Sequence, residues 1–413
     1  MYKKISSCRI CGNKGLTNFL HLGNQMLTGV FPKEKDKERV SSGPLALVKC
    51  IGENSCGLVQ MQYSYSLSEM YGDNYGYRSG LNKSMVDHLH SKVSKITNSV
   101  KLNANDLIID IGSNDATTLK AYPQKSLDLV GIDPTGIKFS SYYPDNIKLI
   151  PDFFSSSLVK AKFGNKKAKV VTSFSMFYDL EEPLTFMKEV HEILDSEGIW
   201  IFEQSYMPKM LEMNSFDTIC HEHLEFYSLH QIKYMTDIVG FHIIEVDFND
   251  INGGSFSITV RKKIGDEQDE GKIKKILHQE SELGLSSMKP YEEFANRIDV
   301  VTKKLIQFVK TERAKGKMIA ALGASTKGNV LLQYFGLSNK EISFIAERNP
   351  KKYNLYTPGT KIKIISEKDS RAMKPDYYLV LPWHFKNEII KREKKDFNNK
   401  SKFIFPLPNL RIY

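Results

Sequence analysis

The sequence predicts an α/β protein with a small cysteine-rich module in front of two helix-flanked parallel sheets. Four of the five cysteines lie within the first 56 residues. Apolar strand-like runs then alternate with helical patterns, first over residues 106–261 and again over residues 318–405. Alternating strands and helices are typical of parallel sheets covered by helices. We therefore expect three domains, at residues 1–75, 76–265 and 266–413.

The length and composition are those of a folded protein with several domains. A chain of 413 residues accommodates two or three domains of roughly 100–200 residues each. Apolar residues make up 41% of the chain, which is enough for ordinary buried cores. No apolar run approaches the roughly 18 residues that span a bilayer, and we find no export signal. We expect a cytoplasmic protein with no membrane partner, either a monomer or a weak homodimer.

The formal net charge of +10 bears on the partners of the chain. Lysine and arginine are spread along the sequence, with local density at 272–275 and 386–395, and this indicates a solvated basic surface. A positive field also attracts a phosphorylated substrate. Single-strand binding needs basic groups interleaved with aromatic side chains, and the sequence has no such stripe. Nucleic acid is therefore not the expected partner.

Two pairs of cysteines in the first module predict a zinc site. Cys8 and Cys11 form a C-x2-C pair, and Cys50 and Cys56 form a second, wider pair. Zinc prefers four tetrahedral ligands, which two short turns can supply in a segment too small for a core of its own. Four thiolates leave no open position for a substrate, so the predicted role is structural. The alternatives are four free thiols, or a site in which His21 replaces one cysteine.

A strand, a turn of small residues and a second strand indicate a nucleotide-type site in the middle segment. Residues 106–111 form the first predicted strand, Gly112 opens the turn, and a helix is expected over residues 116–122. The second strand ends in Asp133, whose carboxylate can accept hydrogen bonds from a ribose diol. Only one glycine of a dinucleotide fingerprint is present. This pattern argues against NAD and favours a cofactor without a pyrophosphate.

The rest of the middle segment has the layout of a class I, Rossmann-like methyltransferase sheet. Such a sheet combines parallel strands and helices with a final antiparallel pair, and its ligand lies at the carboxyl ends of the parallel strands. The predicted strands are 169–174, 199–203, 241–248 and 255–261, and the predicted helices are 183–194, closed by Gly198, and 229–239, closed by Gly240.

Several motifs occur together along the chain. They are the paired cysteines, Tyr75-Gly-Tyr77-Arg-Ser79, the DIGSND turn at 110–115, Glu222-His223, and Gly323-Ala-Ser-Thr-Lys-Gly328. With this set, the chain resembles the three-domain S-adenosylmethionine-dependent sugar C-methyltransferases of nucleotide-deoxysugar pathways over nearly its whole length. The resemblance implies S-adenosylmethionine and Zn²⁺ as cofactors. It also implies methyl transfer to a carbon of a nucleotide-linked 4-keto sugar through an enolate.

The sequence Cys220-His-Glu-His223 is the candidate catalytic loop. Two histidines and a carboxylate suit either a metal or acid–base chemistry, and we favour acid–base chemistry because nothing nearby completes a ligand set. Histidine titrates near neutral pH and can remove a proton beside a ketone, and the enolate oxygen then needs hydrogen-bond donors. The resemblance implies that His223 is the base, that Glu222 orients or polarises, and that Tyr77 lines the sugar site. His221 is the further catalytic candidate, and the alternative is that these residues only anchor the loop.

Two positions depart from the pattern of the family that the chain resembles. Cys220 occupies the place of a tyrosine, and Met176 occupies the place of a histidine, for which Tyr178 or His221 could compensate. These departures leave the sugar, the attacked carbon and the stereochemistry open. Methylation of oxygen or nitrogen therefore stays an alternative. A nucleic-acid methyltransferase and a non-catalytic binding protein are the rival classes.

The last segment is predicted to be a doubly wound α/β domain that binds substrate. A long helix over 291–315 leads into a strand, and the Gly323–Asn329 turn then precedes a helix. Backbone amides of such a turn can hold a phosphate, to which Lys327 adds a charge. Further strands are predicted at 342–346, 377–381 and 402–405, and Trp383 and His384 follow a strand end.

Two further sets of site residues are expected besides the catalytic and zinc-binding ones. The cofactor site is expected to contain Asp110, Gly112, Asn114, Asp115, Asp133, Pro134, Asp152, Phe153 and Ser173. The substrate site is expected to contain Tyr75, Tyr77, Ser79, Tyr178, Glu203, Gly323, Ser325, Thr326, Lys327, Asn329 and Trp383.

Overall fold

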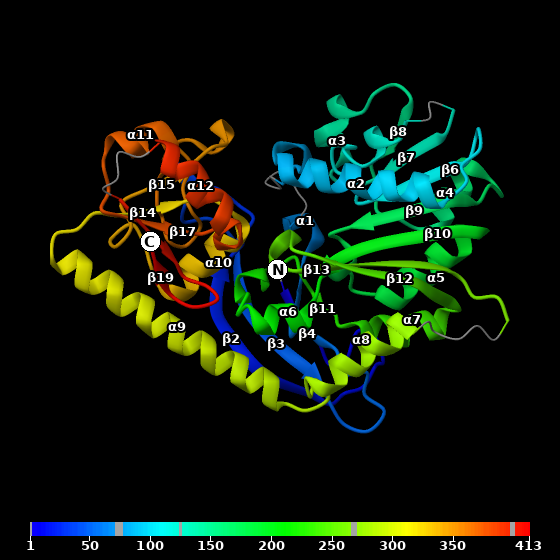
Figure 1. Cartoon of the computed structure of the whole chain (residues 1–413), viewed down its shortest axis with the longest axis horizontal. Helices are drawn as coiled ribbons and strands as arrows, with labels where there is room; N and C mark the ends of the chain where they lie inside the picture. Colours follow the sequence, from blue (N-terminus) through cyan, green and yellow to red (C-terminus); the bar gives the residue numbers. More distant parts are fainter. Residues whose placement is uncertain (1, 71–76, 124–125, 266–270, 397–400) are drawn as a thin grey trace.

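The computed structural model describes residues 2–70, 77–123, 126–265, 271–396 and 401–413. A seven-stranded sheet and a six-stranded sheet lie on opposite sides of the molecule, and the N-terminal strands β2 and β3 lie between them (Figure 1). The expected domain boundaries, 75/76 and 265/266, fall outside the described residues and stay predictions.

The N-terminal segment forms a four-stranded antiparallel sheet in the order β11-β4-β3-β2. Its fourth strand, β11, comes from the middle segment, directly after the candidate catalytic loop. The strands of this sheet are β2 (Leu16–Met26), β3 (Ser42–Cys50), β4 (Val59–Met61) and β11 (Glu225–Phe226). A separate antiparallel pair joins β1 (Tyr2–Lys4) to β5 (Tyr63–Tyr65), and the short helix α1 (Leu67–Met70) follows.

The middle segment forms the expected class I methyltransferase sheet, in the order β12-β13-β10-β9-β6-β7-β8. Strands β10 to β8 of this order are parallel, and β13 is antiparallel to both β10 and β12. The strands are β6 (Leu107–Ile111), β7 (Asp128–Ile132), β8 (Ile147–Ile150), β9 (Ala168–Phe174), β10 (Leu194–Ser205), β12 (Phe241–Asn249) and β13 (Ser255–Lys262).

The longer helices of the middle segment each bury one apolar face. The helices of this segment are α2 (Lys83–Ser99), α3 (Gly136–Phe139), α4 (Ser156–Phe163), α5 (Pro183–Ile193), α6 (Met207–Glu212), α7 (Leu229–Val239) and α8 (Gly271–Glu282). Helix α7 ends as predicted, because Gly240 takes the left-handed conformation with φ of 89°.

Two predictions of local structure are wrong. The helix expected over 116–122 is only a 3-10 turn at Leu119–Ala121, because Ala116 has a positive φ of 60° and Tyr122 precedes a proline, which favours its extended backbone. Gly198 does not close α5. It lies inside β10, into which the chain runs directly from the helix.

The C-terminal segment forms a six-stranded sheet in the order β16-β15-β14-β17-β18-β19, parallel except for β19. The sequence predicts a doubly wound α/β domain here, and the structure has a mostly parallel sheet with helices. The strands are β14 (Ile319–Leu322), β15 (Ile345–Glu347), β16 (Ile364–Ser366), β17 (Tyr377–Val380), β18 (Lys402–Phe405) and β19 (Arg411–Ile412). The helices are α9 (Lys289–Ala314), α10 (Thr326–Phe335), α11 (Glu367–Ala372) and α12 (Lys386–Asp396).

The N-terminal and C-terminal segments share one hydrophobic core. Leu47 of β3, Phe216 before the catalytic loop and Leu332 of α10 belong to the same buried cluster. Helix α9 runs along the outside of this cluster and contacts β2, α6 and α10 (Figure 1). A shared core fixes the parts relative to one another, so a site can be built between them. Within the described part of the chain, no helix has the length and apolar character needed to cross a membrane.

Candidate active site

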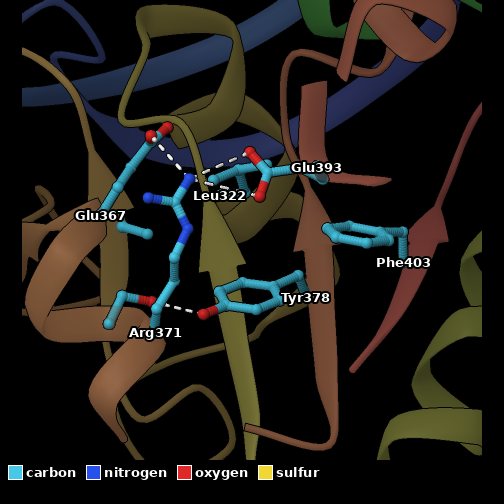
Figure 2. A pocket seen from close by; sticks show the side chains of 8 residues that line it. Leu322, Glu367, Arg371, Tyr378, Glu393 and Phe403 are labelled. Carbon is cyan, nitrogen blue, oxygen red and sulfur yellow. Dashed lines mark hydrogen bonds and ion pairs between the residues drawn. The ribbon is translucent and has the colours of Figure 1, made fainter. Parts of the chain in front are cut away.

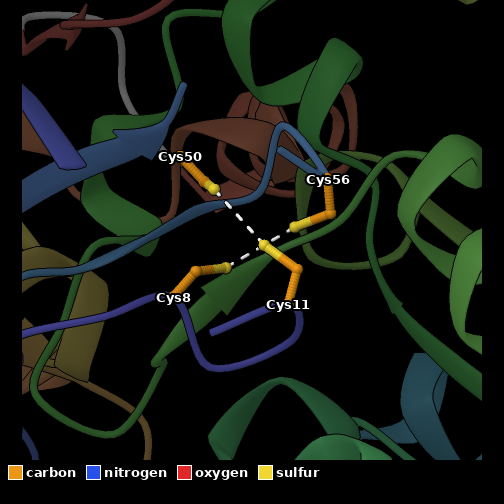
Figure 3. A group of neighbouring side chains, drawn as sticks. All are labelled: Cys8, Cys11, Cys50 and Cys56. Carbon is orange, nitrogen blue, oxygen red and sulfur yellow. Dashed lines mark hydrogen bonds between the residues drawn. The ribbon is translucent and has the colours of Figure 1, made fainter. Parts of the chain in front are cut away.

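The four predicted zinc ligands converge in the structure. The sulfur atoms of Cys8, Cys11, Cys50 and Cys56 all lie within 4.8 Å of one another (Figure 3). Zinc–sulfur bonds of about 2.3 Å in a tetrahedron put the sulfur atoms about 3.8 Å apart, so this cluster fits a zinc ion. Cys8, Cys50 and Cys56 are buried, which leaves little room for an exchangeable ligand. The cluster therefore has the character of a structural site.

A buried lysine, Lys49, lies near the cysteine cluster. Lys49 is buried and donates to the carbonyl oxygen of Gly57 at 3.3 Å. Burial lowers the pKa of Lys49, while the charges of Cys50 and Cys56 oppose that shift. Four thiolates around Zn²⁺ carry a net negative charge, and a buried lysine compensates part of it.

One cavity of about 510 Å³ joins the three parts of the chain. Its volume lies in the range of small-molecule and cofactor sites. Predicted residues from both sheets and the catalytic loop line it: Tyr77, Ser79, Asp110, Gly112, Asn114, Asp133, Pro134, Phe153, Tyr178, Glu222, His223, Ser325, Thr326 and Lys327. The predicted cofactor, catalytic and substrate regions thus open into the same space.

The turn after β6 forms the end of the cavity expected to hold the cofactor. Gly112 has φ of 74°, and a Cβ there would lie 3.0 Å from Cγ of Met176. Asp133 accepts from the backbone N–H of Asn114 at 2.8 Å and from that of Thr135 at 2.7 Å. Oδ1 also accepts from the hydroxyl of Thr135 at 2.6 Å. The carboxylate therefore holds the turn in place, and Oδ2, which accepts from Asn114, keeps a second lone pair for a ligand.

Three residues expected at the cofactor do not line the cavity. Asp115 is buried and accepts from the backbone N–H of Gly80 at 3.1 Å. Asp152 is exposed and accepts from the N–H of Phe153. Ser173 accepts from the indole of Trp200 at 2.9 Å. Strand alternation explains Ser173, because neighbouring side chains of a strand point to opposite faces.

His223 is held in one tautomer by the loop that carries it. Its Nδ1 lies 2.7 Å from the carbonyl oxygen of Thr218, which can only accept, so Nδ1 carries the proton. The neutral ring then has its lone pair on Nε2. Tyr178 packs edge-on against the imidazole, with ring centroids 4.3 Å apart. Burial, together with the charge of Lys327, lowers the pKa of His223 to about 4.

The other residues of this loop have different surroundings. Glu222 lines the cavity and accepts from the thiol of Cys220 at 3.4 Å, and burial raises its pKa. His221 does not line the cavity. It is buried and packs edge-on against Tyr65 of the N-terminal module, with ring centroids 4.7 Å apart.

The turn before α10 brings the C-terminal segment to the cavity. Ser325 caps the helix by accepting from the N–H of Gly328 at 3.0 Å. Lys327 reaches the middle segment and donates to the carbonyl oxygen of Asn252 at 2.6 Å. Burial lowers the pKa of Lys327, and the charge of Asp217 opposes that shift. The lysine therefore stands between the two sheets, within the electrostatic reach of His223.

Four residues expected at the substrate do not line the cavity and instead support the residues around it. Glu203 is buried and bonds to His88 at 2.6 Å and Lys92 at 2.8 Å. Gly323 packs against Pro382. Asn329 donates to the carbonyl oxygen of Thr28, and Trp383 donates to Asp217. Tyr75 lies outside the described residues.

Trp383 and His384 both follow a strand end and are candidates for the cleft between the domains. His384 lines the cavity, and Trp383 does not. Burial lowers the pKa of His384 to about 3, and Lys327 adds to the shift. No sequence pattern indicated Asp217. It is buried, and burial raises its pKa. Asp217 belongs to no motif, whereas the strand end before Trp383 pointed to His384.

A second, small cavity lies between the C-terminal sheet and helices α11 and α12 (Figure 2). Arg371 pairs with Glu367 and Glu393 across it, each at 3.4 Å, and Tyr378 and Ser370 share a hydrogen bond of 2.7 Å. Its volume is about 10 Å³, enough for about one water molecule. This network joins α11 and α12 to the sheet and offers no space for a substrate.

Comparisons with known proteins agree with this arrangement. Residues 8–71 match a family model described as "Putative zinc binding domain", residues 85–246 match a methyltransferase domain, and residues 250–408 match a C-methyltransferase C-terminal domain. The chain is 28% identical to the C-methyltransferase NovU of Streptomyces niveus, over 99% of this chain and 97% of that protein.

Solved methyltransferases share weaker similarity with the chain. The CcbJ methyltransferase of Streptomyces caelestis is 10% identical, covering 43% of this chain and 90% of its own, with a TM-score of 0.33. The 1,6-didemethyltoxoflavin-N1-methyltransferase of Burkholderia thailandensis, solved with S-adenosylhomocysteine, is 8% identical, covering 45% and 81%, also with a TM-score of 0.33.

The sheet order and the matched domains define an S-adenosylmethionine-dependent methyltransferase that carries a zinc-binding module. More particularly, the zinc-binding, methyltransferase and C-methyltransferase C-terminal domains follow one another in that order, and the chain is similar to the C-methyltransferase NovU over nearly the full length of both proteins.

Proposed function

We propose that the chain transfers a methyl group from S-adenosylmethionine to a carbon of a nucleotide-linked 4-keto sugar, through an enolate formed by His223. The observation that carries this proposal is the contact between Nδ1 of His223 and the carbonyl oxygen of Thr218 at 2.7 Å. This contact leaves the imidazole lone pair on Nε2, and His223 lines the shared cavity. S-adenosylmethionine, when bound, supplies an electrophilic methyl group.

The bonds balance for a proton transfer followed by an alkylation. Nε2 of His223 takes a proton from the carbon beside the ketone, the C–H electron pair forms the C=C bond of the enolate, and the C=O π pair moves onto the oxygen. The enolate carbon then forms a bond to the methyl group while the carbon–sulfur bond breaks. The imidazolium returns its proton to solvent, and the ketone is restored.

The low pKa of His223 makes it a weak base, so the enolate needs stabilisation by neighbouring donors. Two cavity residues suit that need. Lys327 brings an ammonium group, and Glu222 has a pKa raised by burial, which favours the protonated carboxyl that can donate. We assign these two residues to the oxygen that becomes negative.

The turn before α10 is our candidate site for the diphosphate of the nucleotide. A helix of ten residues begins at Thr326, and its first N–H groups and dipole favour a negative charge. Ser325 and Thr326 line the cavity beside the ammonium of Lys327. The net charge of +10 also favours capture of an anionic substrate.

The proposal is tested by locating the transferred methyl group. The zinc-loaded protein is incubated with ¹³C-methyl S-adenosylmethionine and a panel of thymidine, uridine, guanosine and cytidine diphosphate 4-keto-6-deoxyhexoses, and products are read by ¹³C NMR. A methyl signal on a sugar carbon is expected for at least one member. A methyl group on oxygen or nitrogen contradicts the enolate mechanism.

A further inference from the structure

Arg9 lies inside the Cys8–Cys11 knuckle, yet its side chain points into the protein and is only 3% exposed. Its guanidinium donates to the carbonyl oxygen of Met61 and to the hydroxyl of Ser64, each at 2.8 Å. Its Nε also lies 3.4 Å from Glu181 and 3.5 Å from Glu225. A residue between two zinc ligands thus contacts two carboxylates of the methyltransferase segment.

Glu225 is a fully buried carboxylate with few partners. Its side chain is 0% exposed, and neither of its oxygens accepts a hydrogen bond within the described residues. Arg9 is the cation that faces it. Burial raises the pKa of Glu225 and the charge of Arg9 opposes that shift, so the guanidinium is the group that favours an ionised carboxyl at this buried position.

The two carboxylates flank the residues that we place at the reaction. Glu181 follows Tyr178 by three residues, and Glu225 follows His223 by two. The two loops are joined by the bond from the N–H of Leu224 to the carbonyl oxygen of Tyr178, at 2.7 Å. The N-terminal sheet extends this chain of contacts, because the N–H of Met61 donates to the carbonyl oxygen of Leu224 at 2.8 Å.

We propose that Arg9 is a positioning residue, through which the zinc knuckle holds the loops that present Tyr178 and His223 to the cavity. The guanidinium fixes β4 through Met61 and β11 through Glu225, and β11 begins two residues after His223. The zinc module then acts on catalysis without touching the substrate. This inference rests on the proposed role of His223 only for its effect on turnover.

Arg9→Met tests the proposal in the zinc-loaded full chain. Hydrogen-exchange mass spectrometry should show amides of residues 218–226 exchanging about tenfold faster, because the loop opens locally more often. ¹⁵N NMR of labelled histidine should show loss of the fixed Nδ1–H tautomer of His223. Zinc content by elemental analysis and affinity for S-adenosylhomocysteine should stay at parent values, while kcat falls.

Several comparisons keep the test decisive. Arg39→Met, at an arginine whose side chain is 81% exposed, is the matched control and should change nothing. Parent-like exchange of 218–226 in Arg9→Met overturns the proposal, and so does equal acceleration in peptides of β6 and β9. If Arg9→Met does not fold, Arg9→Lys is measured, since it keeps the charge but cannot span Met61, Ser64 and Glu225. Parent-like exchange in that variant also overturns the proposal.

The outcome is separable from that of the proposed function. Exchange and the histidine spectrum need no substrate, so they report on Arg9 even if the product carries its methyl group on oxygen. Conversely, a methyl group on carbon with an unchanged loop in Arg9→Met supports the reaction and removes Arg9 from it.

Discussion

The indole Nε1 of Trp383 donates to Oδ2 of Asp217 at 2.9 Å and so joins the C-terminal segment to the stretch just before the candidate catalytic loop. Asp217 directly precedes Thr218, whose carbonyl oxygen orients His223. Trp383 therefore supports the segment that orients His223 and does not itself line the cavity. The C-terminal segment anchors the segment that orients the proposed base.

Trp383→Phe should lower kcat about tenfold, because a buried carboxylate loses its donor at a cost of about 1–3 kcal/mol and the loop at 217–223 shifts. Steady-state kinetics measure the effect, with KM little changed. Tyr377→Phe is the matched control, since Tyr377 also donates to a carboxylate, Glu312, but away from the cavity. Parent kcat in Trp383→Phe would show that the anchor is dispensable.

Cys50→Ser should lose the zinc ion and destabilise the N-terminal sheet, because three thiolates hold Zn²⁺ much more weakly than four and the binding energy contributes to folding. Elemental analysis and thermal unfolding measure both effects. Cys220→Ser removes the buried cysteine outside the cluster and should keep one zinc per chain. A zinc-free parent protein, expressed with zinc supplied, would refute the assignment.

Asp133→Ala should weaken binding of S-adenosylhomocysteine about 10- to 100-fold, as expected for charge-assisted hydrogen bonds worth about 1.5–3 kcal/mol. Because Asp133 also accepts from Asn114 and Thr135, Asp133→Asn separates the charge from the support of the turn. Calorimetry measures the affinity, and Asp145→Ala, at an exposed position, is the control. Parent affinity in Asp133→Ala would remove this residue from the cofactor site.

His221 should make folding sensitive to acid. Burial lowers its pKa from 6.5 to about 4, so the unfolded chain binds a proton more readily than the folded chain between these values. Stability is then complete above pH 6.5 and falls as the pH drops toward 4, by about 3 kcal/mol for this group. His223 and His384 act in the same direction.

Urea unfolding of the parent and of His221→Asn between pH 4.5 and 7.5 checks this expectation. The variant should show a flatter loss of stability on acidification, and His230→Asn, at an exposed histidine, is the matched control. Identical slopes for the parent and His221→Asn would contradict it.

Much of the architecture could be predicted because it follows from local pattern. The four zinc ligands follow from spacing, and the antiparallel pair of β12 and β13 follows from two apolar runs around glycines. The turn at Gly112 and the acid at Asp133 follow from the order of strand, turn and strand. Each of these patterns lies within a short stretch of chain, and the structure that it predicts is also determined by residues close together in the sequence.

The supporting contacts could not be predicted, since they join residues far apart in sequence. Glu203 looked like a strand-end ligand but bonds to His88 and Lys92 of α2. Asn329 belongs to a phosphate-type turn, yet its amide holds Thr28 of the first module. Whether Trp383 or His384 meets the cavity depends on backbone direction after a strand, which residue identity alone does not determine.

The central claim is that His223 removes the proton beside the ketone, and exchange of that proton tests it most directly. The nucleotide-linked 4-keto sugar that is methylated is incubated in D₂O with S-adenosylhomocysteine and with parent protein or His223→Asn, and loss of the α-proton signal is followed by ¹H NMR. A positioned base contributes about 10²–10⁴ in rate, so the variant should exchange slower by about that factor while binding S-adenosylhomocysteine normally. Exchange by His223→Asn at the parent rate would contradict the account and place the base elsewhere in the cavity.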